Sequence, residues 1–340
     1  MANIALRNPQ FKHILAGVTA KSVVCRLTID GTLRYTLVKN LPTLVSLQPQ
    51  TINFEIAELA RDYLEIAYDV NYTPQFVDIE TNLKSYDALN GTGNEVDTPA
   101  TIVDKGFEAY GDFLEGANPE ITFNRTAPTF LIANDTPPTA TNTFTILAPT
   151  GETGKVPSIT SLGGFVVNSF SAIDTAVSNP DSIVCNIKRI GCTKYGDGHK
   201  IIFINKYGVQ QDLWFFLKKT KRIARTNEGY KANTITYPSD SPATYSTENP
   251  ANKVFNTQGK QTYTLSSGFY PEFANQFFEE LLLSEYIWLS ELIAIAAKTY
   301  IKVPVKVKTS SMAFKTGVND RLIQYTIEFE DAFDYINNIR

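Results

Sequence analysis

Two dense apolar runs lie close together in the second half of this 340-residue chain. The first covers residues 201–204 (IIFI) and the second covers residues 213–217 (LWFFL). Residues 205–208 (NKYG) lie between them, and a break that contains Asn and Gly is typical of the turn between antiparallel strands. Because neither run alternates with polar residues, both indicate strands that are covered on both faces. The segment therefore predicts a β-hairpin inside a β-rich body, and it holds no arrangement of residues suited to chemistry.

The composition favours a globular, mainly β protein. The chain contains 21 Phe and 17 Tyr, and aromatic side chains fit the pleated surface of a sheet. Its formal net charge of −4 argues against a general nucleic-acid coat, which is basic overall. Three cysteines do not make a disulfide framework, although one bridge stays open, and their scarcity fits folding in a reducing cytoplasm. We expect no cleaved leader and no membrane span, because the apolar runs are too short.

Residues 1–83 are expected to form an N-terminal β body with one short helix. Residues 22–37 predict two strands, because alternating apolar residues flank the turn pair Asp30-Gly31. Residues 56–64 have apolar side chains at helical spacing and charged side chains between them, which predicts the helix.

The remainder of the chain is expected to contain two further parts. Residues 84–170 predict a loop-rich β insertion, because Thr, Asn, Gly and Pro dominate and short apolar pieces recur. Residues 171–340 predict a C-terminal β body. Within it, residues 226–262 carry three prolines and few aliphatic residues, which predicts an extended loop or arm. Residues 271–284 predict a helix, since a proline begins the segment and its apolar residues share one face.

Two strands near the C-terminus are expected to pair with each other. Residues 300–308 alternate between apolar residues and lysines, and residues 322–330 alternate between apolar residues and polar ones that include glutamates. Opposite charges on facing strands stabilise such a pair. Together these patterns predict a mainly β (α+β) fold of antiparallel sandwich-like or barrel-like sheets, with two short helices and long polar loops.

Residues 149–156 (PTGETGKV) resemble a phosphate-binding loop at first sight. The full pattern requires Gly in place of Pro149 and Ser or Thr in place of Val156. Pro157 also opposes the helix whose N-terminus would bind phosphate. We therefore expect a solvent-exposed loop and no nucleotide.

Other candidates for chemistry are also weak. Cys185, Cys192 and His199 do not have the paired spacing of a structural zinc site. With His13 and His199 as the only histidines, a catalytic triad has almost no material. A glycosidase built on paired carboxylates leaves no short signature, so that alternative stays open. We expect no catalytic residue, no cofactor and no metal, and therefore not an enzyme.

One dense cluster of cations follows the apolar hairpin. Its members are Lys218, Lys219, Lys221, Arg222 and Arg225. Such a cluster is either an ordinary solvated strand end, a contact with an acidic neighbouring subunit, or a contact with DNA that passes nearby. In a chain of net negative charge we favour the protein contact, with any contact to DNA incidental. These five residues are the predicted interface.

Several segments resemble tail-structure proteins of tailed bacteriophages, in particular crAss-like podoviruses and other phages of Bacteroidetes hosts. The similar segments are residues 53–64, 194–216, 280–289, 304–305 and 324–332. They are patterns of packing residues from the start, the middle and the end of the chain. The resemblance implies a virion protein, made in the host bacterial cytoplasm, that assembles with copies of itself into a ring of the tail, neck or baseplate. Its partners would be its own copies and adjacent tail or neck proteins, with no membrane.

The physical properties of the chain agree with a ring subunit, which needs a stiff β body and contacts to its neighbours. In a closed ring these contacts join different faces of one subunit. The alternative function is a carbohydrate- or receptor-binding β-sandwich protein of the virion, in which polar loops and exposed tyrosines form the binding site. A wall-degrading enzyme is a third and less favoured possibility.

Overall fold

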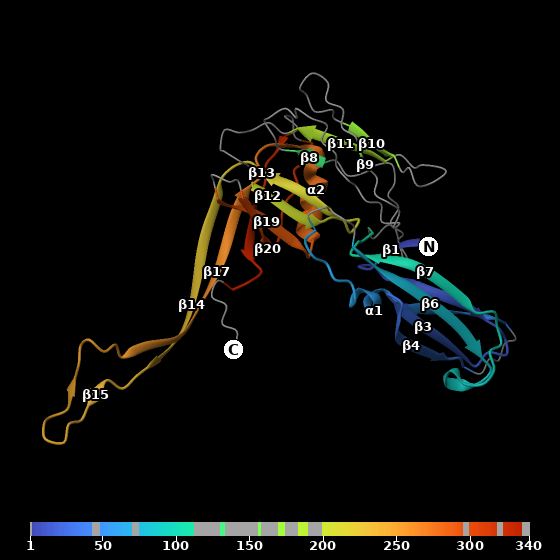
Figure 1. Ribbon diagram of the computed structural model, residues 1–340, viewed down its shortest axis with the longest axis horizontal. Helices are drawn as coiled ribbons and strands as arrows, with labels where there is room; N and C mark the ends of the chain where they lie inside the picture. Colours follow the sequence, from blue (N-terminus) through green and yellow to red (C-terminus); the bar gives the residue numbers. More distant parts are fainter. Residues whose placement is uncertain are drawn as a thin grey trace. The chain divides into compact units, whose positions relative to one another are not determined.

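A computed structural model describes residues 2–42, 48–69, 75–111, 199–294, 299–317 and 322–334, together with four short strands between residues 111 and 199 (Figure 1). Contacts divide the chain into two compact units. The first unit comprises Met1–Cys192, Ile202–Trp214 and Gln276–Glu285. The second unit comprises Thr193–Ile201, Phe215–Asn275 and Tyr286–Arg340. Both units consist mainly of β-strands.

The first unit is centred on a five-stranded sheet with the order β1-β7-β6-β3-β4. Its strands are β1 (Ala2–Ala5), β3 (Ser22–Ile29), β4 (Thr32–Asn40), β6 (Phe76–Tyr86) and β7 (Ala100–Phe107). β1 is parallel to β7, and the other neighbours are antiparallel. Asp30 and Gly31 join β3 to β4 with positive φ angles of 48° and 74°, as a tight hairpin turn requires. This confirms the predicted turn.

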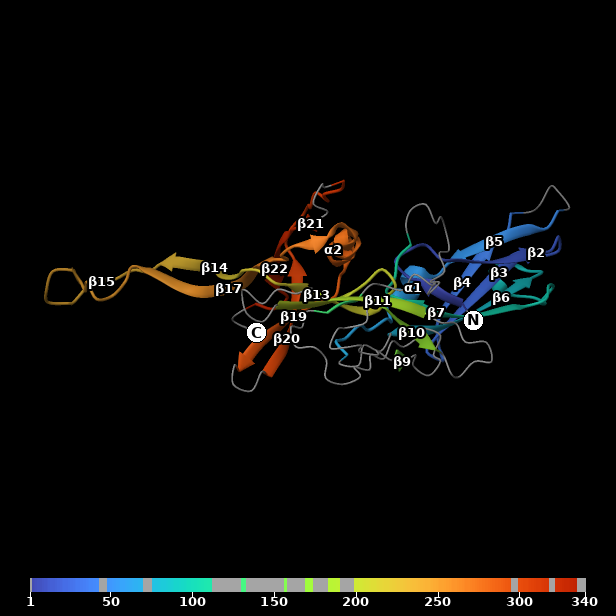
Figure 2. The ribbon, with the colours of Figure 1, turned by 90° about the horizontal axis from the view of Figure 1, so that it is seen from above.

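A smaller layer packs on one face of this sheet. It consists of β2 (Phe11–Ala16), β5 (Gln50–Glu55) and the helix α1 (Ala57–Arg61), and Figure 2 shows β2 and β5 on one side of β3 and β6. β6 alternates, with Val77 and Ile79 buried while Asp78 and Glu80 are exposed. One core cluster joins β1, β3 and β6 to α1, and a second joins β3 and β6 to β2 and β5. The result is a two-layer β-sandwich that contains the predicted first helix.

Shorter elements complete the part of the first unit that precedes residue 192. A 3₁₀ turn, η1 (Leu89–Gly91), follows β6. A four-stranded sheet with the order β8-β11-β10-β9 is formed by β8 (Phe130–Ile132), β9 (Val156–Pro157), β10 (Ser169–Ile173) and β11 (Ile183–Arg189). β6 runs continuously through the boundary that the sequence predicted between residues 83 and 84.

The apolar hairpin predicted from the sequence is formed by β12 (His199–Ile204) and β13 (Gln210–Phe215). Residues 201–204 are each at most 5% exposed, which confirms a strand that is covered on both faces. The buried Asn205 fixes the turn, because its Oδ1 accepts hydrogen bonds from the backbone N–H groups of Tyr207 (3.0 Å) and Val209 (3.1 Å). The second strand begins at Gln210, earlier than its apolar run indicated.

The second predicted helix is also confirmed. A 3₁₀ turn, η3 (Glu272–Ala274), leads into α2 (Asn275–Leu283). α2 buries Phe277, Phe278 and Leu281 on one face, as the apolar spacing predicted.

The strands β19-β20-β22-β17-β14 of the second unit lie next to one another in a seven-stranded sheet with the order β13-β12-β19-β20-β22-β17-β14. They are β14 (Lys219–Lys231), β17 (Asn252–Ser266), β19 (Ile287–Ala294), β20 (Thr299–Val307) and β22 (Thr326–Asp331). These neighbouring strands are antiparallel, and Lys306 on β20 is directly opposite Glu330 on β22. This confirms the expected pairing of a strand that presents lysines with one that presents glutamates.

The strand predicted over residues 322–330 is interrupted. Its first part, β21 (Leu322–Ile323), pairs with β18 (Tyr270–Pro271). Between β21 and β22 the backbone of Tyr325 bonds to Ser267: Tyr325 N donates to Ser267 Oγ (2.9 Å), and Ser267 N donates to Tyr325 O (2.8 Å). These bonds satisfy the Tyr325 backbone outside the β20–β22 ladder, so a continuous strand was the wrong prediction.

The arm predicted over residues 226–262 is a two-stranded β-ribbon. β14 and β17 pair from Lys219↔Leu265 to Lys231↔Asn252, with an irregularity at Glu228/Gly229. A small pair, β15 (Ile235–Thr236) and β16 (Thr244–Tyr245), lies at its far end (Figure 1). A loop was therefore the wrong local structure, because backbone pairing needs no apolar alternation in the side chains.

The structure confirms the predicted fold class. It is mainly β, its pairings are predominantly antiparallel, and it has two α-helices. The described strands do not close into a barrel. Neither helix in the described part of the chain has the length and apolarity needed to cross a membrane.

Candidate subunit interface

The β14–β17 ribbon extends beyond the sheet to which it belongs. β17 pairs with β22 only over Thr262–Ser266, whereas it pairs with β14 as far as Asn252. Within the described residues, the part of the ribbon beyond Thr262 therefore has no third strand. Every residue from Thr220 to Lys231 is exposed. We call the segment from Lys218 to Lys260 the arm.

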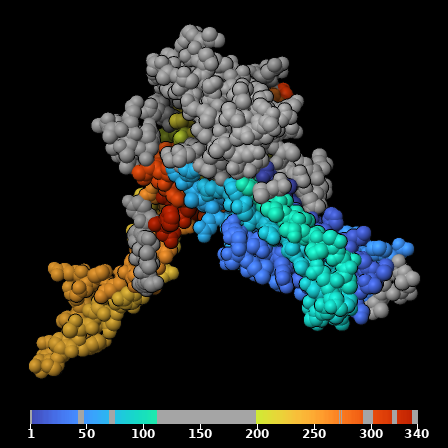
Figure 3. Space-filling model, turned by 45° about the vertical axis from the view of Figure 1, so that its right-hand side comes forward, coloured from blue at the N-terminus to red at the C-terminus, as the bar shows by residue number. Residues whose placement is uncertain are grey.

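The arm presents apolar side chains to solvent on both of its strands and at its tip. Seven of them are between 46% and 72% exposed: Ile223, Tyr230, Ile235, Tyr237, Tyr245, Val254 and Phe255. Figure 3 shows the surface of the arm, coloured yellow to orange. A lone two-stranded hairpin is marginally stable in water, and an exposed apolar series usually marks an interaction surface. These side chains are what a partner could cover.

The arm also differs in charge from the rest of the chain. It contains eight Lys or Arg and three Asp or Glu, a net charge of +5. The rest of the chain contains 23 Lys or Arg and 32 Asp or Glu, a net charge of −9. The arm is thus basic, whereas the rest of the chain is acidic.

Two of the five predicted interface residues form ion pairs within their own subunit, at the start of β14, which we call the root of the arm. Lys219 Nζ lies 3.2 Å from Glu291 Oε1 on β19, and Lys221 Nζ lies 3.8 Å from the same oxygen. Both ammonium groups also lie over the ring of Tyr263, at 4.9 and 5.4 Å from its centroid. Such contacts of a cation with an aromatic ring are attractive. Lys219 and Lys221 therefore fix the arm to its sheet.

The other three predicted residues remain available to a partner. Lys218 and Arg222 are exposed and form no ion pair with any residue that the structure describes. Arg225 is exposed too, and its Nε donates a hydrogen bond to Asn227 Oδ1 at 2.6 Å. Adjacent strand residues point to opposite faces, so Lys221 and Arg222 lie on different faces of the ribbon. The structure places four of the five cations on β14 and Lys218 directly before it, and it divides them between the two faces of the ribbon.

Three further titratable groups surround this root. Burial raises the pKa of Tyr263 above its usual range, with the Glu291 and Asp331 carboxylates acting in the same direction. Burial also raises the pKa of Asp331, although a hydrogen bond from Tyr263 opposes the shift. Burial lowers the pKa of His199, and the positive charge of Lys219 acts in the same direction as a smaller cause. His199 is half-buried at the start of β12, whereas the sequence favoured a place at the solvent edge.

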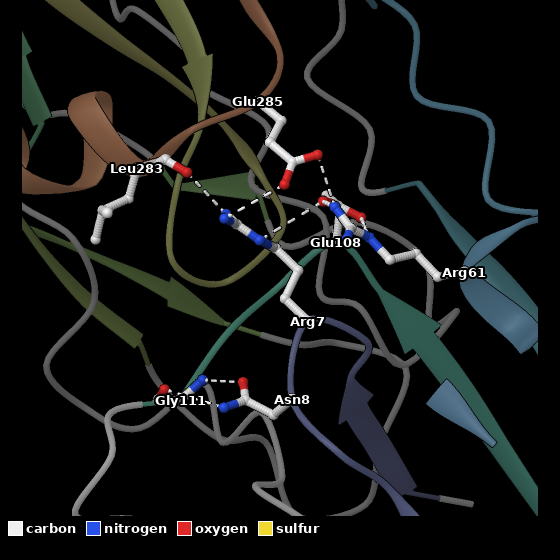
Figure 4. Close-up of polar contacts among 7 residues, drawn as sticks. All are labelled: Arg7, Asn8, Arg61, Glu108, Gly111, Leu283 and Glu285. Atoms are coloured by element: carbon white, nitrogen blue, oxygen red, sulfur yellow. Dashed lines mark hydrogen bonds and ion pairs between the residues drawn. The ribbon is translucent and has the colours of Figure 1, made fainter. Parts of the chain in front are cut away.

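A second group of charges lies inside the first unit and was not expected from the sequence (Figure 4). The buried Glu108 accepts hydrogen bonds from Arg61 Nε (3.0 Å) and Arg61 Nη2 (2.5 Å). Arg61 Nη2 also lies 2.7 Å from Glu285 Oε2, and the Glu108 hydrogen bonds are the largest cause that raises the pKa of Arg61. Arg7 Nε lies 3.8 Å from Glu108 Oε1, and Arg7 Nη2 lies 3.5 Å from Glu285 Oε1.

Backbone contacts complete this network. Arg7 Nη1 donates to the carbonyl of Leu283 at 2.9 Å, at the end of α2. Asn8 Oδ1 accepts from Gly111 N at 2.7 Å, and Asn8 Nδ2 donates to Gly111 O at 3.3 Å. The network joins the N-terminal sandwich to the segment that follows α2 within one unit. It satisfies all its charges internally, so it is a structural joint.

Sequence reasoning missed Glu291 and the network in Figure 4 for different reasons. Glu291 is a charged residue within the largely apolar strand β19, and that signal could have indicated a charged partner within the fold. Arg7, Arg61, Glu108 and Glu285 follow no common spacing, so the sequence contains no comparable signal for them.

The other candidates for chemistry are placed as follows. In the described part of the chain, no three His, Cys, Asp or Glu side chains are grouped as a metal ion would require. Cys192 and residues 149–155 of the loop that resembled a phosphate site lie outside the described residues, and Cys185 belongs to β11. His13 is exposed on β2. It lines a small pocket together with Lys12, and Lys12 Nζ lies 2.5 Å from Oδ2 of the buried Asp104.

Comparison with protein families, with curated proteins and with solved structures finds no match to this chain.

Proposed function

We propose that this chain is a structural virion protein of a tailed bacteriophage that assembles, through its arm, as a homo-oligomeric ring in the tail, neck or baseplate. The resemblance of its packing residues supports the phage context. The exposed arm supports the assembly, and it is the observation that carries the proposal. Neither the arm nor the network of Arg7, Arg61, Glu108 and Glu285 has the arrangement of a catalytic site, so the proposed role is not enzymatic.

The energetics of the arm favour a partner. Fully burying one large apolar side chain stabilises by about 1.5–3 kcal/mol, and the seven apolar residues of the arm are about half exposed. Covering them would therefore contribute several kcal/mol, on the order of the cost of immobilising a partner. A subunit whose arm contacts a different face of the next copy forms a heterologous contact, which closes into a ring when the rotation allows.

The test is the oligomeric state of the full chain and of a variant without the outer arm. Replacing residues 227–257 by Asn-Gly joins the facing residues Thr226 and Gln258 through a two-residue hairpin turn. Size-exclusion chromatography with light scattering should give an oligomer of fixed size for the full chain and a monomer for the variant. Far-UV circular dichroism should show that the variant is folded. A monomeric full chain, or a folded variant that assembles normally, would refute the proposal.

The alternative, a carbohydrate- or receptor-binding protein of the virion, is favoured by one observation. Tyr237 and Tyr245, at the tip of the arm, are 72% and 70% exposed, and such aromatic faces can stack on sugar rings. A glycan array separates the two functions. A monomer that binds a saccharide, and loses it on substitution of Tyr237→Ala and Tyr245→Ala, would support this alternative.

A further inference from the structure

We propose that the arm of one copy docks on the face formed by α1 and the free edge of β4 in the neighbouring copy. This inference rests on the proposed function and names the surface that receives the arm. It joins two features that the described residues leave without a partner: a basic two-stranded ribbon, and the open edge of β4 beside the acidic segment around α1.

The charge of the arm requires an acidic partner. Lys218, directly before β14, and Arg222 form no ion pair among the described residues, and strand alternation places their side chains on the same face of the ribbon. Like charges in an interface are strongly unfavourable, and opposite charges set its register. The partner surface must therefore carry carboxylates that its own subunit leaves unpaired.

The segment around α1 meets that requirement. Residues 55–69 contain five Asp or Glu and one basic residue, Arg61. Arg61 is bound by Glu108 and Glu285, so it does not neutralise this surface. Glu58 and Asp62 are both exposed, and they lie four positions apart, which places them on the same side of the helical turn.

The edge of β4 is an independent observation that points to a strand as the partner. β4 is the last strand of its sheet, and among the described strands it pairs only with β3. Leu33 and Val38 on β4 are 54% and 43% exposed. An open edge strand with exposed apolar residues is a template for another strand, and β14 is itself the edge strand of its sheet.

Aromatic contacts place this edge beside α1. The rings of Tyr35, on β4, and Tyr63, just after α1, pack edge to face with centroids 6.0 Å apart. Both cations of β4 face their own subunit: the guanidinium of Arg34 lies over the same Tyr63 ring at 4.7 Å, and Lys39 Nζ donates a hydrogen bond to the carbonyl of Asn53 at 2.6 Å. Carboxylates, an apolar strip and an open edge therefore occur together, which is the complement of the arm.

Nucleic acid is a poorer fit to the arm. A β-ribbon that enters a groove of DNA carries cations where it meets the phosphates. Residues 233–250, which form the tip, contain no Lys or Arg and two acidic residues, Asp240 and Glu248. The cations lie nearer the root, where a second protein surface can reach them.

The test uses two full-length variants with reversed charges. One carries Lys218→Glu and Arg222→Glu on one face of the arm, and the other carries Glu58→Lys and Asp62→Lys at α1. Alone, each variant opposes like charges across the contact, so its self-association should weaken by at least about tenfold. Mixed in equal amounts, every arm can meet an opposite charge on a different copy. Native mass spectrometry of the mixture should therefore recover hetero-association at close to the wild-type affinity.

A matched control reverses two exposed carboxylates on another face of the same unit, Asp78→Lys and Glu80→Lys on β6. This control should self-associate normally and should not restore the arm variant. Circular dichroism verifies that all variants are folded, and restored association in the mixture also excludes misfolding as the cause of the single defects.

Each outcome bears on the proposal. If neither single variant assembles and their mixture does not assemble either, the proposed docking face is wrong. The proposed function survives that result if the variant with the shortened arm also fails to assemble. If either variant alone assembles normally, the contact is wrong. If the arm variant assembles normally but loses retention of a labelled DNA duplex, the arm is a nucleic-acid element and the proposal is overturned.

Discussion

The guanidinium of Arg61 holds the carboxylate of Glu108 through two hydrogen bonds, from Nε to Oε2 at 3.0 Å and from Nη2 to Oε1 at 2.5 Å. The Glu108 side chain is only 3% exposed, so its charge depends on this partner. Arg7, at 3.8 Å, is a weaker second partner. This paired geometry makes Arg61 the charge on which the joint between the sandwich and the segment after α2 depends.

Replacing Arg61→Ala should lower the free energy of unfolding by about 2–4 kcal/mol, because it leaves a buried carboxylate without its main counterion. Urea titration followed by circular dichroism measures this change. The double variant Arg61→Met with Glu108→Met should lose less, since it removes both charges together.

Lys84 provides the control for that measurement. Its ion pair with Glu95, at 2.9 Å, joins side chains that are 28% and 32% exposed. Lys84→Ala should cost less than about 1 kcal/mol, as for other surface pairs. An equal cost for the Arg61 and Lys84 substitutions would show that burial of Glu108 does not matter.

Glu280 predicts a dependence of stability on pH. It lies on α2, it is 3% exposed, and burial raises its pKa above the usual 4.5. Hydrogen bonds from Gln276 Nε2 (2.9 Å) and Lys206 N (3.4 Å) oppose that shift. A carboxyl group whose pKa is higher in the folded state contributes stability below its unfolded pKa and loses it as pH rises through the folded pKa.

Glu280→Gln should therefore stabilise the protein at neutral pH relative to the wild type, and the difference should shrink toward pH 4. Unfolding titrations between pH 4 and pH 8 measure it. The exposed Glu248→Gln, at the tip of the arm, serves as the control and should show no such pH-dependent difference from the wild type. A wild-type advantage that grows with pH would contradict the assignment.

The parts of the fold that the sequence predicted are those with a local signal. The alternation around Lys306 and Glu330 identified two strands and their pairing, because a period of two follows directly from strand geometry. Asp30 and Gly31 identified a turn because few residues tolerate positive φ. In both cases the information lies within a few residues of the feature that it determines.

The arm and the charged joint could not be predicted in the same way. Residues 226–262 contain few aliphatic residues, and their apolar side chains do not alternate with polar ones, so the sequence of these strands resembles that of a loop. Arg7, Arg61 and Glu285 meet only after distant segments fold, and no local spacing records that contact. The interface predicted for the five cations stays a prediction, and the ion pairs of Lys219 and Lys221 with Glu291 could not be predicted because β19 lies far along the chain.

Cys25 is predicted to be chemically inert in the folded protein. The side chain is fully buried, and burial raises the pKa of its thiol from 9.0 to about 11. At pH 8 about one thiol in a thousand is then ionised, and the thiolate is the reactive form. Iodoacetamide at pH 8 should modify Cys25 only after denaturant is added, as measured by peptide mass spectrometry. Rapid modification of the native protein would show that this part of the sandwich core opens readily.

Glu291 and Arg222 should respond in opposite ways, because one anchors the arm and the other is available to a partner. Glu291→Gln removes the carboxylate that Lys219 and Lys221 share, and the Lys219 side chain is only 16% exposed. This should lower the free energy of unfolding by about 1–2 kcal/mol, since a half-buried cation loses its counterion. Arg222→Glu, on an exposed face, should change that free energy by no more than about 0.5 kcal/mol. Arg222→Glu should instead weaken self-association, as measured by light scattering. Glu291→Gln should affect self-association only indirectly, because it weakens the attachment of the arm to its own sheet. If Arg222→Glu destabilised the monomer and left assembly intact, the cations of the arm would serve the fold of their own subunit and not its neighbour.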